Sequence, residues 1–189
     1  MSDSKYTLEE YMEMEEKSLE KHEFYQGEIF AMEGASIAHN QITSNAHIAI
    51  GSFLSDRGKC NIFQSDLKIH SSVNSLFTYP DLSIVCGKIE TLEKHKDIVT
   101  NPSVLVEVLS ESTQDYDRGG KFKLYRDIAS LKEYIIISST EMLVEKYDKQ
   151  ADGSWVLHVY GEADTFEIGS VEMQMPVKVL YRNVAFELE

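Results

Sequence analysis

The sequence predicts an α/β (α+β) fold, in which a mixed central β-sheet is flanked by helices and extended by additional N-terminal and C-terminal strands. Helical and strand periodicities alternate along the chain, and a dense run of Val and Leu near residue 105 has the composition of a central strand. No internal repeat, low-complexity tract or Pro/Gly/Ser linker interrupts this order. The 189 residues are therefore predicted to form one domain, 1–189, with a substantial core.

The first part of the chain is predicted to contain two helices and a hairpin. Residues 7–10, TLEE, have the spacing of a capping box, which predicts a short acidic helix to about residue 19. The segment HEFYQGEIFAM, residues 22–32, predicts two short strands around Gly27. Apolar side chains recur at helical spacing over residues 37–55 and predict an amphipathic helix.

The rest of the chain is predicted to consist of strands and one further helix, which runs from about 116 to 129. The dipeptide Asp152-Gly153 predicts a hairpin turn between two of the late strands. The predicted strands lie in the segments CNIFQSDLKIH (60–70), TYPDLSIVCG (78–87), NPSVLVEVLS (101–110), KEYIIIS (132–138), MLVEKYD (142–148), SWVLHVY (154–160), FEIG (166–169) and PVKVLY (176–181).

Glu107 is a carboxylate within the most apolar predicted strand. In an extended strand it shares one face with Leu105 and Leu109, while three valines share the other face. Both faces have the composition of buried surfaces. Burial of an ionised carboxylate costs several kcal/mol unless another group compensates it. The sequence therefore raises the question of what lies beside Glu107.

Asp81 offers one compensation for Glu107. It follows Pro80 at the start of the apolar run LSIVC, so the two carboxylates could lie at the ends of adjacent strands. Such a pair can share a Mg²⁺ ion, which takes one or two carboxylates and completes its shell with water and phosphate oxygens. Three other interpretations stay open. Asp81 could cap a turn, Glu107 could pair with a Lys or Arg, or solvent could reach Glu107 at the strand edge.

Lys121 lies on the apolar stripe of the helix predicted at 116–129, four positions before Tyr125. Lys123 falls on the opposite, polar face, so Lys121 is the lysine expected to point towards the sheet. The alternative is a surface pair between Asp117 and Lys121 at i, i+4 spacing.

Two further polar residues are candidates for the same site. Glu23 lies beside apolar residues in the first predicted hairpin, where an ordinary exposed strand position is the alternative. His39 begins the helix predicted at 37–55, in line with Ile42. A lone His in that position is otherwise a polar helix-end residue or a satisfied core residue.

Charge and cysteine content argue against several classes of protein. A net charge of −14 and a pI of about 4.8 argue against a protein that coats nucleic acid non-specifically. The acidity is concentrated at the ends, because residues 34–140 contain twelve acidic and eleven basic side chains. Cys60 and Cys86 have no paired-motif spacing, so neither a zinc site nor a disulfide is predicted. No membrane-length apolar run is present, and a cytoplasmic location without a membrane partner is expected.

The order of the segments resembles the PD-(D/E)XK nuclease superfamily. Pro80-Asp81 followed by Glu107 on the next strong strand matches its signature. The wider series HEFYQGEIFAM, AHNQITSN, SDLKI, YPDLSIVC, LVEVLSEST, YDRGGKFKLY and LKEYIII follows one branch of it, from about residue 6 to 180. On these segments the chain is identified as a member of the bacterial restriction-endonuclease family formerly known as a domain of unknown function.

The resemblance implies a restriction-endonuclease-like core with metal-binding acids on adjoining strands and a site of five residues. By matching position, Asp81 and Glu107 correspond to the metal ligands, Lys121 to the family lysine and Glu23 to an upstream acid, while His39 matches a polar position that lines the same cleft.

Two positions depart from the family pattern. Leu109 stands where the superfamily usually has a lysine two residues after the acid, which fits a transfer of that role to Lys121. Glu111 replaces a proline of the family and adds a negative charge near the expected phosphate path, which would weaken DNA binding.

Two functions from different classes follow. The first is a DNA endonuclease dependent on Mg²⁺ or Mn²⁺, in which Asp81, Glu107 and the Val108 carbonyl hold the metal. Lys121 would orient water or stabilise charge on the phosphate, and Glu23 would complete the coordination. The alternative is a catalytically silent module of the same fold that binds nucleic acid or a protein partner. A metal-dependent hydrolase of another phosphodiester is a third reading, and a homodimer is expected by family analogy.

Overall fold

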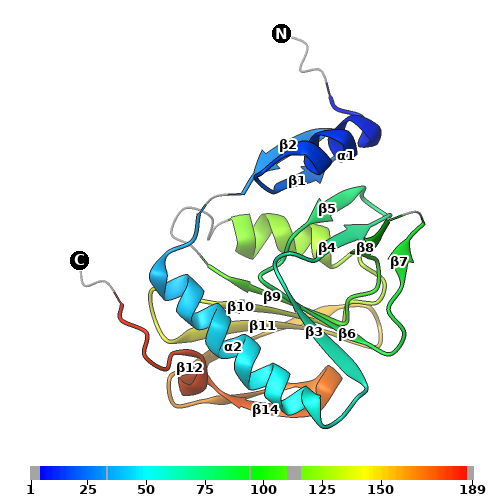
Figure 1. The fold of residues 1–189 in the computed structure, drawn as a ribbon. Helices are drawn as coiled ribbons and strands as arrows, with labels where there is room; N and C mark the ends of the chain where they lie inside the picture. Colours follow the sequence, from blue (N-terminus) through cyan, green and yellow to red (C-terminus); the bar gives the residue numbers. More distant parts are fainter. Residues whose placement is uncertain (1–4, 33, 94, 110–115, 187–189) are drawn as a thin grey trace.

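The structure is a computed structural model that describes residues 5–32, 34–93, 95–109 and 116–186. Within these residues the strands form two six-stranded sheets and a separate hairpin (Figure 1). The mixed α+β architecture predicted from the sequence is confirmed. The first sheet, here called the main sheet, contains in spatial order β12 (Trp155–Gly161), β11 (Leu143–Lys149), β10 (Glu133–Ile137), β9 (Val104–Val108), β6 (Leu82–Cys86) and β3 (Cys60–Gln64).

Helices cover both faces of the main sheet. Helix α2 (Ile37–Ser55) crosses one face (Figure 1), and its buried side chains pack against the valines of β9. The π-helical turn η1 (Tyr116–Lys121) and helix α3 (Phe122–Tyr125) lie on the other face, where Leu105 of β9 is buried. The two faces of β9 therefore alternate as predicted. None of the helices in the described part of the chain has both the length and the apolarity to cross a bilayer.

The second sheet, here called the N-terminal sheet, packs beneath the first helix. Helix α1 (Leu8–Lys17) begins at a Thr7–Glu10 capping box, as predicted. Tyr11 of this helix packs against Phe24 and Phe77 on one face of the sheet. In spatial order the strands are β2 (Glu28–Ala31), β1 (His22–Tyr25), β5 (Leu76–Thr78), β4 (Lys68–Ser71), β8 (His95–Val99) and β7 (Thr91–Leu92).

The chain passes from one sheet to the other within two of the segments predicted to contain a strand. The segment 60–70 is β3 in the main sheet and β4 in the N-terminal sheet, separated by a turn. The segment 78–87 likewise ends β5 at Thr78 and begins β6 at Leu82, with Pro80 between them. The single strand predicted over 60–70 was wrong, whereas the strand predicted after Pro80 is confirmed as β6. Alternating polarity marks the extended backbone of two successive strands and does not report a change of sheet.

Other differences concern the later part of the chain. The helix predicted over 116–129 is a π-helical turn followed by α3, which ends at Tyr125. The strand predicted at 176–181 is wrong, because β14 (Met173–Pro176) ends there and α4 (Val177–Leu180) follows. β14 pairs with β13 (Thr165–Ile168), and the two are joined by the 3₁₀ turn η2 (Gly169–Val171).

Cys60 and Cys86 form a disulfide, which corrects the expectation of two unpaired cysteines. They are directly opposite one another in the antiparallel pair β3–β6. The two cysteines are adjacent because of the register of β3 and β6, and no short sequence motif indicates that register. Because disulfides are rare in a reducing cytosol, the cytoplasmic location stays a prediction.

Removal of this disulfide is expected to lower the free energy of unfolding by about 3 kcal/mol, because the bond closes a loop with a sequence separation of 26. Urea denaturation of the wild type and of a Cys60→Ser/Cys86→Ser variant, each with and without reductant, measures the effect. Reductant should lower the midpoint of the wild type only. An equal midpoint for oxidised wild type and the double variant would contradict the expectation.

Candidate active site

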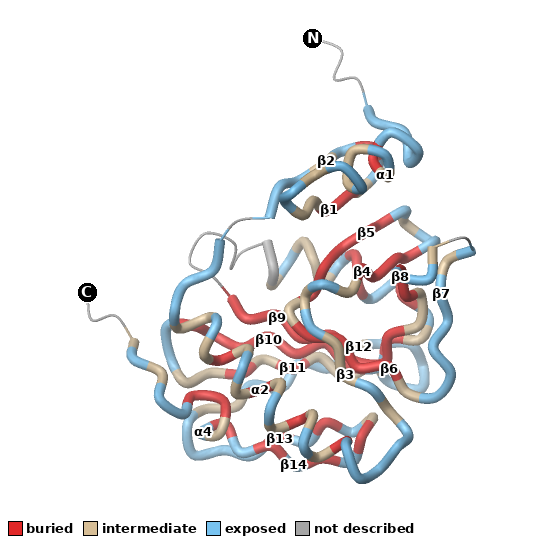
Figure 2. The backbone as a smooth tube through the Cα atoms, in the orientation of Figure 1, coloured by how far each residue is buried: buried red, intermediate tan, exposed pale blue. Residues whose placement is uncertain are grey.

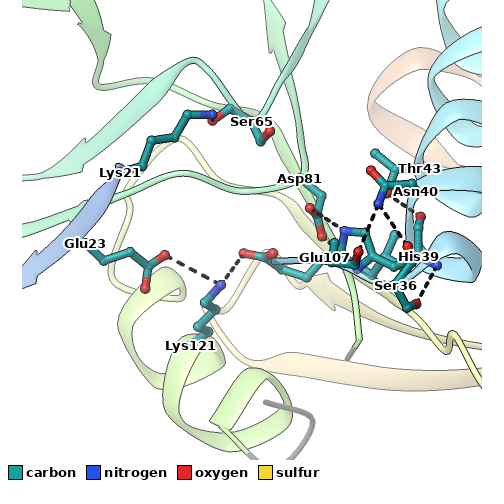
Figure 3. Close-up of polar contacts among 12 residues, drawn as sticks. Lys21, Glu23, Ser36, His39, Asn40, Thr43, Ser65, Asp81, Glu107 and Lys121 are labelled. Atoms are coloured by element: carbon teal, nitrogen blue, oxygen red, sulfur yellow. Dashed lines mark hydrogen bonds and ion pairs between the residues drawn. The ribbon is translucent and has the colours of Figure 1, made fainter. Parts of the chain in front are cut away.

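Glu107 lies near the C-terminal end of β9, and its side chain is only 5% exposed. Two donors reach its Oε1 atom: the ammonium Nζ of Lys121 at 3.1 Å (Figure 3) and the hydroxyl of Tyr125 at 2.7 Å. An ion pair and a hydrogen bond thus offset the desolvation of this carboxylate. Of the interpretations left open for Glu107, pairing with a lysine is confirmed.

The local helical geometry brings both donors to Glu107. Lys121 ends η1 and Tyr125 ends α3, so the two residues are four positions apart and project from the same side. Lys123 is exposed on the other side, as the stripe of apolar residues predicted. The alternative partner of Lys121, the side chain of Asp117, lies outside the described side chains.

Glu23 of β1 brings a second carboxylate to Lys121. Its Oε1 atom lies 3.6 Å from Lys121 Nζ and accepts a 2.5 Å hydrogen bond from the Thr78 hydroxyl. The Thr78 and Tyr125 hydroxyl oxygens are 3.0 Å apart. Burial first, and then the charges of Glu107 and Glu23, raise the pKa of Tyr125 well above its ordinary value, so its hydroxyl stays protonated. We call the closed set of Glu23, Thr78, Tyr125, Glu107 and Lys121 the carboxylate–lysine ring.

Asp81 precedes β6 and forms a second group with His39 of α2. Asp81 and His39 are drawn in Figure 3, and Oδ1 of Asp81 lies 3.0 Å from His39 Nε2. The Oδ2 atom of Asp81 accepts a 2.8 Å hydrogen bond from the Val108 amide. His39 itself follows the N-cap Ser36, whose hydroxyl accepts from the His39 amide. The helix start and the strand start therefore fix the imidazole and the carboxylate against each other.

The two groups meet at the C-terminal end of β9. The register places Leu82 opposite Val106, so Asp81 and Glu107 occupy the next step along the adjacent strands. The Val108 amide, one residue beyond Glu107, donates to Asp81. Asp81 contacts His39 of α2, on one face of the main sheet. Glu107 contacts Tyr125 of α3, on the other face. The five residues singled out from the sequence thus form two groups of contacts, which are linked along the chain by Glu107 and Val108 of β9, and their catalytic roles stay predictions.

Comparison with known proteins identifies the family of this chain. A family profile described as Uma2, putative restriction endonuclease, matches residues 8–177. The chain belongs to the Uma2 family. Two Synechocystis proteins are similar to it: uncharacterized protein slr1290 is 40% identical over 182 residues, 96% of this chain and 94% of the relative. Uncharacterized protein sll1609 is 37% identical over 151 residues, 80% of this chain and 85% of the relative.

A solved structure shares the fold of this Uma2 protein. The crystal structure of a putative nuclease belonging to DUF820 from Anabaena variabilis superimposes with a TM-score of 0.78 at 18% identity. The match covers 95% of this chain and 99% of the other. The predicted family and the restriction-endonuclease-like fold are therefore confirmed, and the family supports a nuclease-like function.

A magnesium ion at the site of this Uma2 protein stays a prediction. Among the described residues, no three His, Cys, Asp or Glu side chains gather as metal ligands. Asp81 and Glu107 nevertheless carry carboxylates, the ligand type that Mg²⁺ takes from proteins, and a carboxylate oxygen can accept more than one bond. The predicted part of the Val108 carbonyl in this set stays a prediction, since the contact seen for Val108 is made by its amide.

Thr78 and Tyr125 were missed as site residues. Tyr125 belongs to the apolar stripe of the predicted helix, and its position four residues after Lys121 is the signal that both side chains reach the same carboxylate. Thr78 carried no signal, because its contact with Glu23 depends on the pairing of β1 with β5. The predicted effect of Glu111 concerns a residue outside the described ranges.

Proposed function

We propose that this protein is a metal-dependent DNA endonuclease that hydrolyses phosphodiester bonds, with Mg²⁺ or Mn²⁺ as its cofactor. The observation that carries the proposal is Lys121, which lies between the buried carboxylates of Glu23 and Glu107. One carboxylate is enough to neutralise the charge of one lysine. Here two carboxylates share one ammonium, with Asp81 one step away on the adjacent strand, so the local charge favours a further cation.

Each residue has a role that follows from its contacts. Asp81 and Glu107 would supply oxygen ligands, and a bound Mg²⁺ would polarise the scissile phosphate and lower the pKa of a water molecule. His39 and the Val108 amide hold the Asp81 carboxylate in one orientation. Lys121 provides a fixed positive charge for the negative charge that develops on the phosphate, and Glu23 and Glu107 hold that ammonium in place.

A catalytically silent module that binds nucleic acid or a protein partner is the second candidate function. The specific observation in its favour is that Glu107 is already compensated by Lys121 and Tyr125. The fold can therefore keep this carboxylate buried without a metal ion. The net charge of −14 also opposes tight binding to phosphate.

Cleavage of supercoiled plasmid in Mg²⁺ or Mn²⁺ tests the proposal. We expect nicking by the wild type, its loss in EDTA, and a rate at least about 100-fold lower in Asp81→Asn and Glu107→Gln, as for loss of groups that stabilise developing charge. Gel analysis of nicked product over time gives the rates, and circular dichroism checks that each variant is folded.

Lys123→Ala is the matched control, because Lys123 is exposed on the other side of the helix that presents Lys121. This variant should cleave at the rate of the wild type. Nicking that survives both carboxylate substitutions would contradict the mechanism. Absence of cleavage on every DNA, with either metal, would favour the silent module.

A further inference from the structure

Phe30 lies at the outer end of a row of side chains that crosses the N-terminal sheet. The register pairs Phe30 of β2 with Glu23 of β1. Glu23 accepts from Thr78 of β5, which is paired in turn with Ile69 of β4. Directly paired residues of neighbouring strands project from the same face of a sheet. Phe30 therefore shares a face, and an adjacent position, with a carboxylate of the carboxylate–lysine ring.

Burial along this row ends at Phe30. Ile69 and Thr78 are buried and Glu23 is 8% exposed, whereas Phe30 is 42% exposed. β2 is the edge strand of the sheet, and Figure 2 shows most of it as exposed. The preceding residue, Ile29, packs on the opposite face against the cluster that includes Tyr11. The row thus leads from the core, through the ring, to an aromatic side chain that solvent reaches.

We infer that Phe30 is a binding surface on which an unpaired nucleobase of a DNA strand stacks, while the adjoining phosphate lies at the carboxylate–lysine ring. The inference rests on the proposed function and names its substrate class: single-stranded DNA, or a duplex with an unpaired base. A base inside a duplex has both faces covered by its neighbours, so the ring of Phe30 can stack only on a base that has left the stack.

Stacking on Phe30 would supply affinity that the charge of the protein does not. With a net charge of −14, sequence-independent attraction to the phosphate backbone is weak. Stacking of a base on an aromatic side chain contributes about 1 to 3 kcal/mol per base and does not depend on a positive protein surface. An aromatic ring beside the ring of carboxylates therefore supplies affinity where electrostatics does not.

Binding in Ca²⁺, measured by fluorescence anisotropy of labelled oligonucleotides, tests the inference without requiring cleavage. The probes are a single strand, the matching duplex, and that duplex with one bulged base. For the single strand and the bulged duplex, Phe30→Ala should weaken binding between about 5-fold and about 150-fold, the equivalent of one stacked base. Phe30→Trp, which keeps an aromatic ring, should bind these two probes like the wild type. Neither substitution should change binding to the perfect duplex.

Tyr6→Ala is the matched control, because Tyr6 is 52% exposed but lines a hollow with Phe24 and Phe77 on the opposite face of the N-terminal sheet. The inference falls if the wild type binds none of the probes, if Phe30→Ala binds the single strand like the wild type, or if Tyr6→Ala is equally impaired. Binding that depends on Phe30 without any cleavage in Mg²⁺ or Mn²⁺ would retain the inference and reject the endonuclease.

Discussion

Replacement of Lys121 by methionine is expected to lower the free energy of unfolding by about 3 to 5 kcal/mol, the usual cost of removing one partner from a buried ion pair. The substitution leaves the carboxylates of Glu23 and Glu107 facing each other without the ammonium between them. Urea denaturation followed by circular dichroism measures the change. If the protein is an endonuclease, the same substitution should also lower the nicking rate by about 100-fold or more.

Two further variants show whether charge is the cause of this loss. Lys123→Met changes an exposed lysine in the same helix and should alter stability by no more than about 0.5 kcal/mol. Glu107→Gln in the Lys121→Met background removes the unpaired charge and should recover part of the lost stability. A double variant less stable than Lys121→Met would show that steric loss, and not an unpaired carboxylate, is the cause.

Glu133→Ala is expected to lower the free energy of unfolding by about 3 kcal/mol, which corresponds to a melting temperature about 6 to 12 °C lower. Glu133 is buried on β10, where it pairs with Lys146 at 2.9 Å and accepts from the amides of Gly169 and Ser170. Burial opposes the charge on Lys146, but hydrogen bonds to Asp148 and Glu133 outweigh it and raise the pKa of Lys146. Thermal unfolding measures the loss.

This second buried ion cluster separates stability from chemistry. Glu133→Ala should leave the nicking rate unchanged at a temperature where the variant is folded, because no contact of Glu133 within the described residues reaches the carboxylate–lysine ring. Glu167→Ala, an exposed carboxylate on β13, should change neither quantity. A variant Glu133→Ala that is folded but unable to cleave would contradict this separation.

The sequence predicted the parts of the fold that depend on local pattern. The helix over 37–55, the capping box at Thr7 and the two-faced burial of β9 follow from periodicities that a single segment contains. The choice of Lys121 over Lys123 had the same basis, because the apolar stripe decides which lysine faces the sheet. Glu23 and His39 were predicted as site residues from the family resemblance. Local pattern alone favoured an exposed strand position for Glu23 and a helix-end or core position for His39.

Features that depend on pairing could not be read from one segment. Cys60 and Cys86 meet through the register of β3 and β6, and Thr78 meets Glu23 through the pairing of β5 with β1. The passage of the chain between sheets at the turn 65–67 leaves the alternation of polarity intact, so the sequence of β3 and β4 predicted a single strand. The π-helical turn that ends at Lys121 could not be predicted either, because the spacing of apolar residues indicated one regular helix over 116–129.

The crossing of the chain between the two sheets makes the site a product of the complete topology. The hydrogen bonds of the site join residues that are far apart in the sequence. Thr78 and Glu23 are 55 positions apart, His39 and Asp81 are 42 apart, and Val108 and Asp81 are 27 apart. Contacts of such separation require long loops to close, which costs chain entropy. A fragment that begins after β2 would keep the pair of Lys121 and Glu107 but would lose Glu23 and Phe30. In this protein, a correctly formed site therefore reports that both sheets have folded and docked.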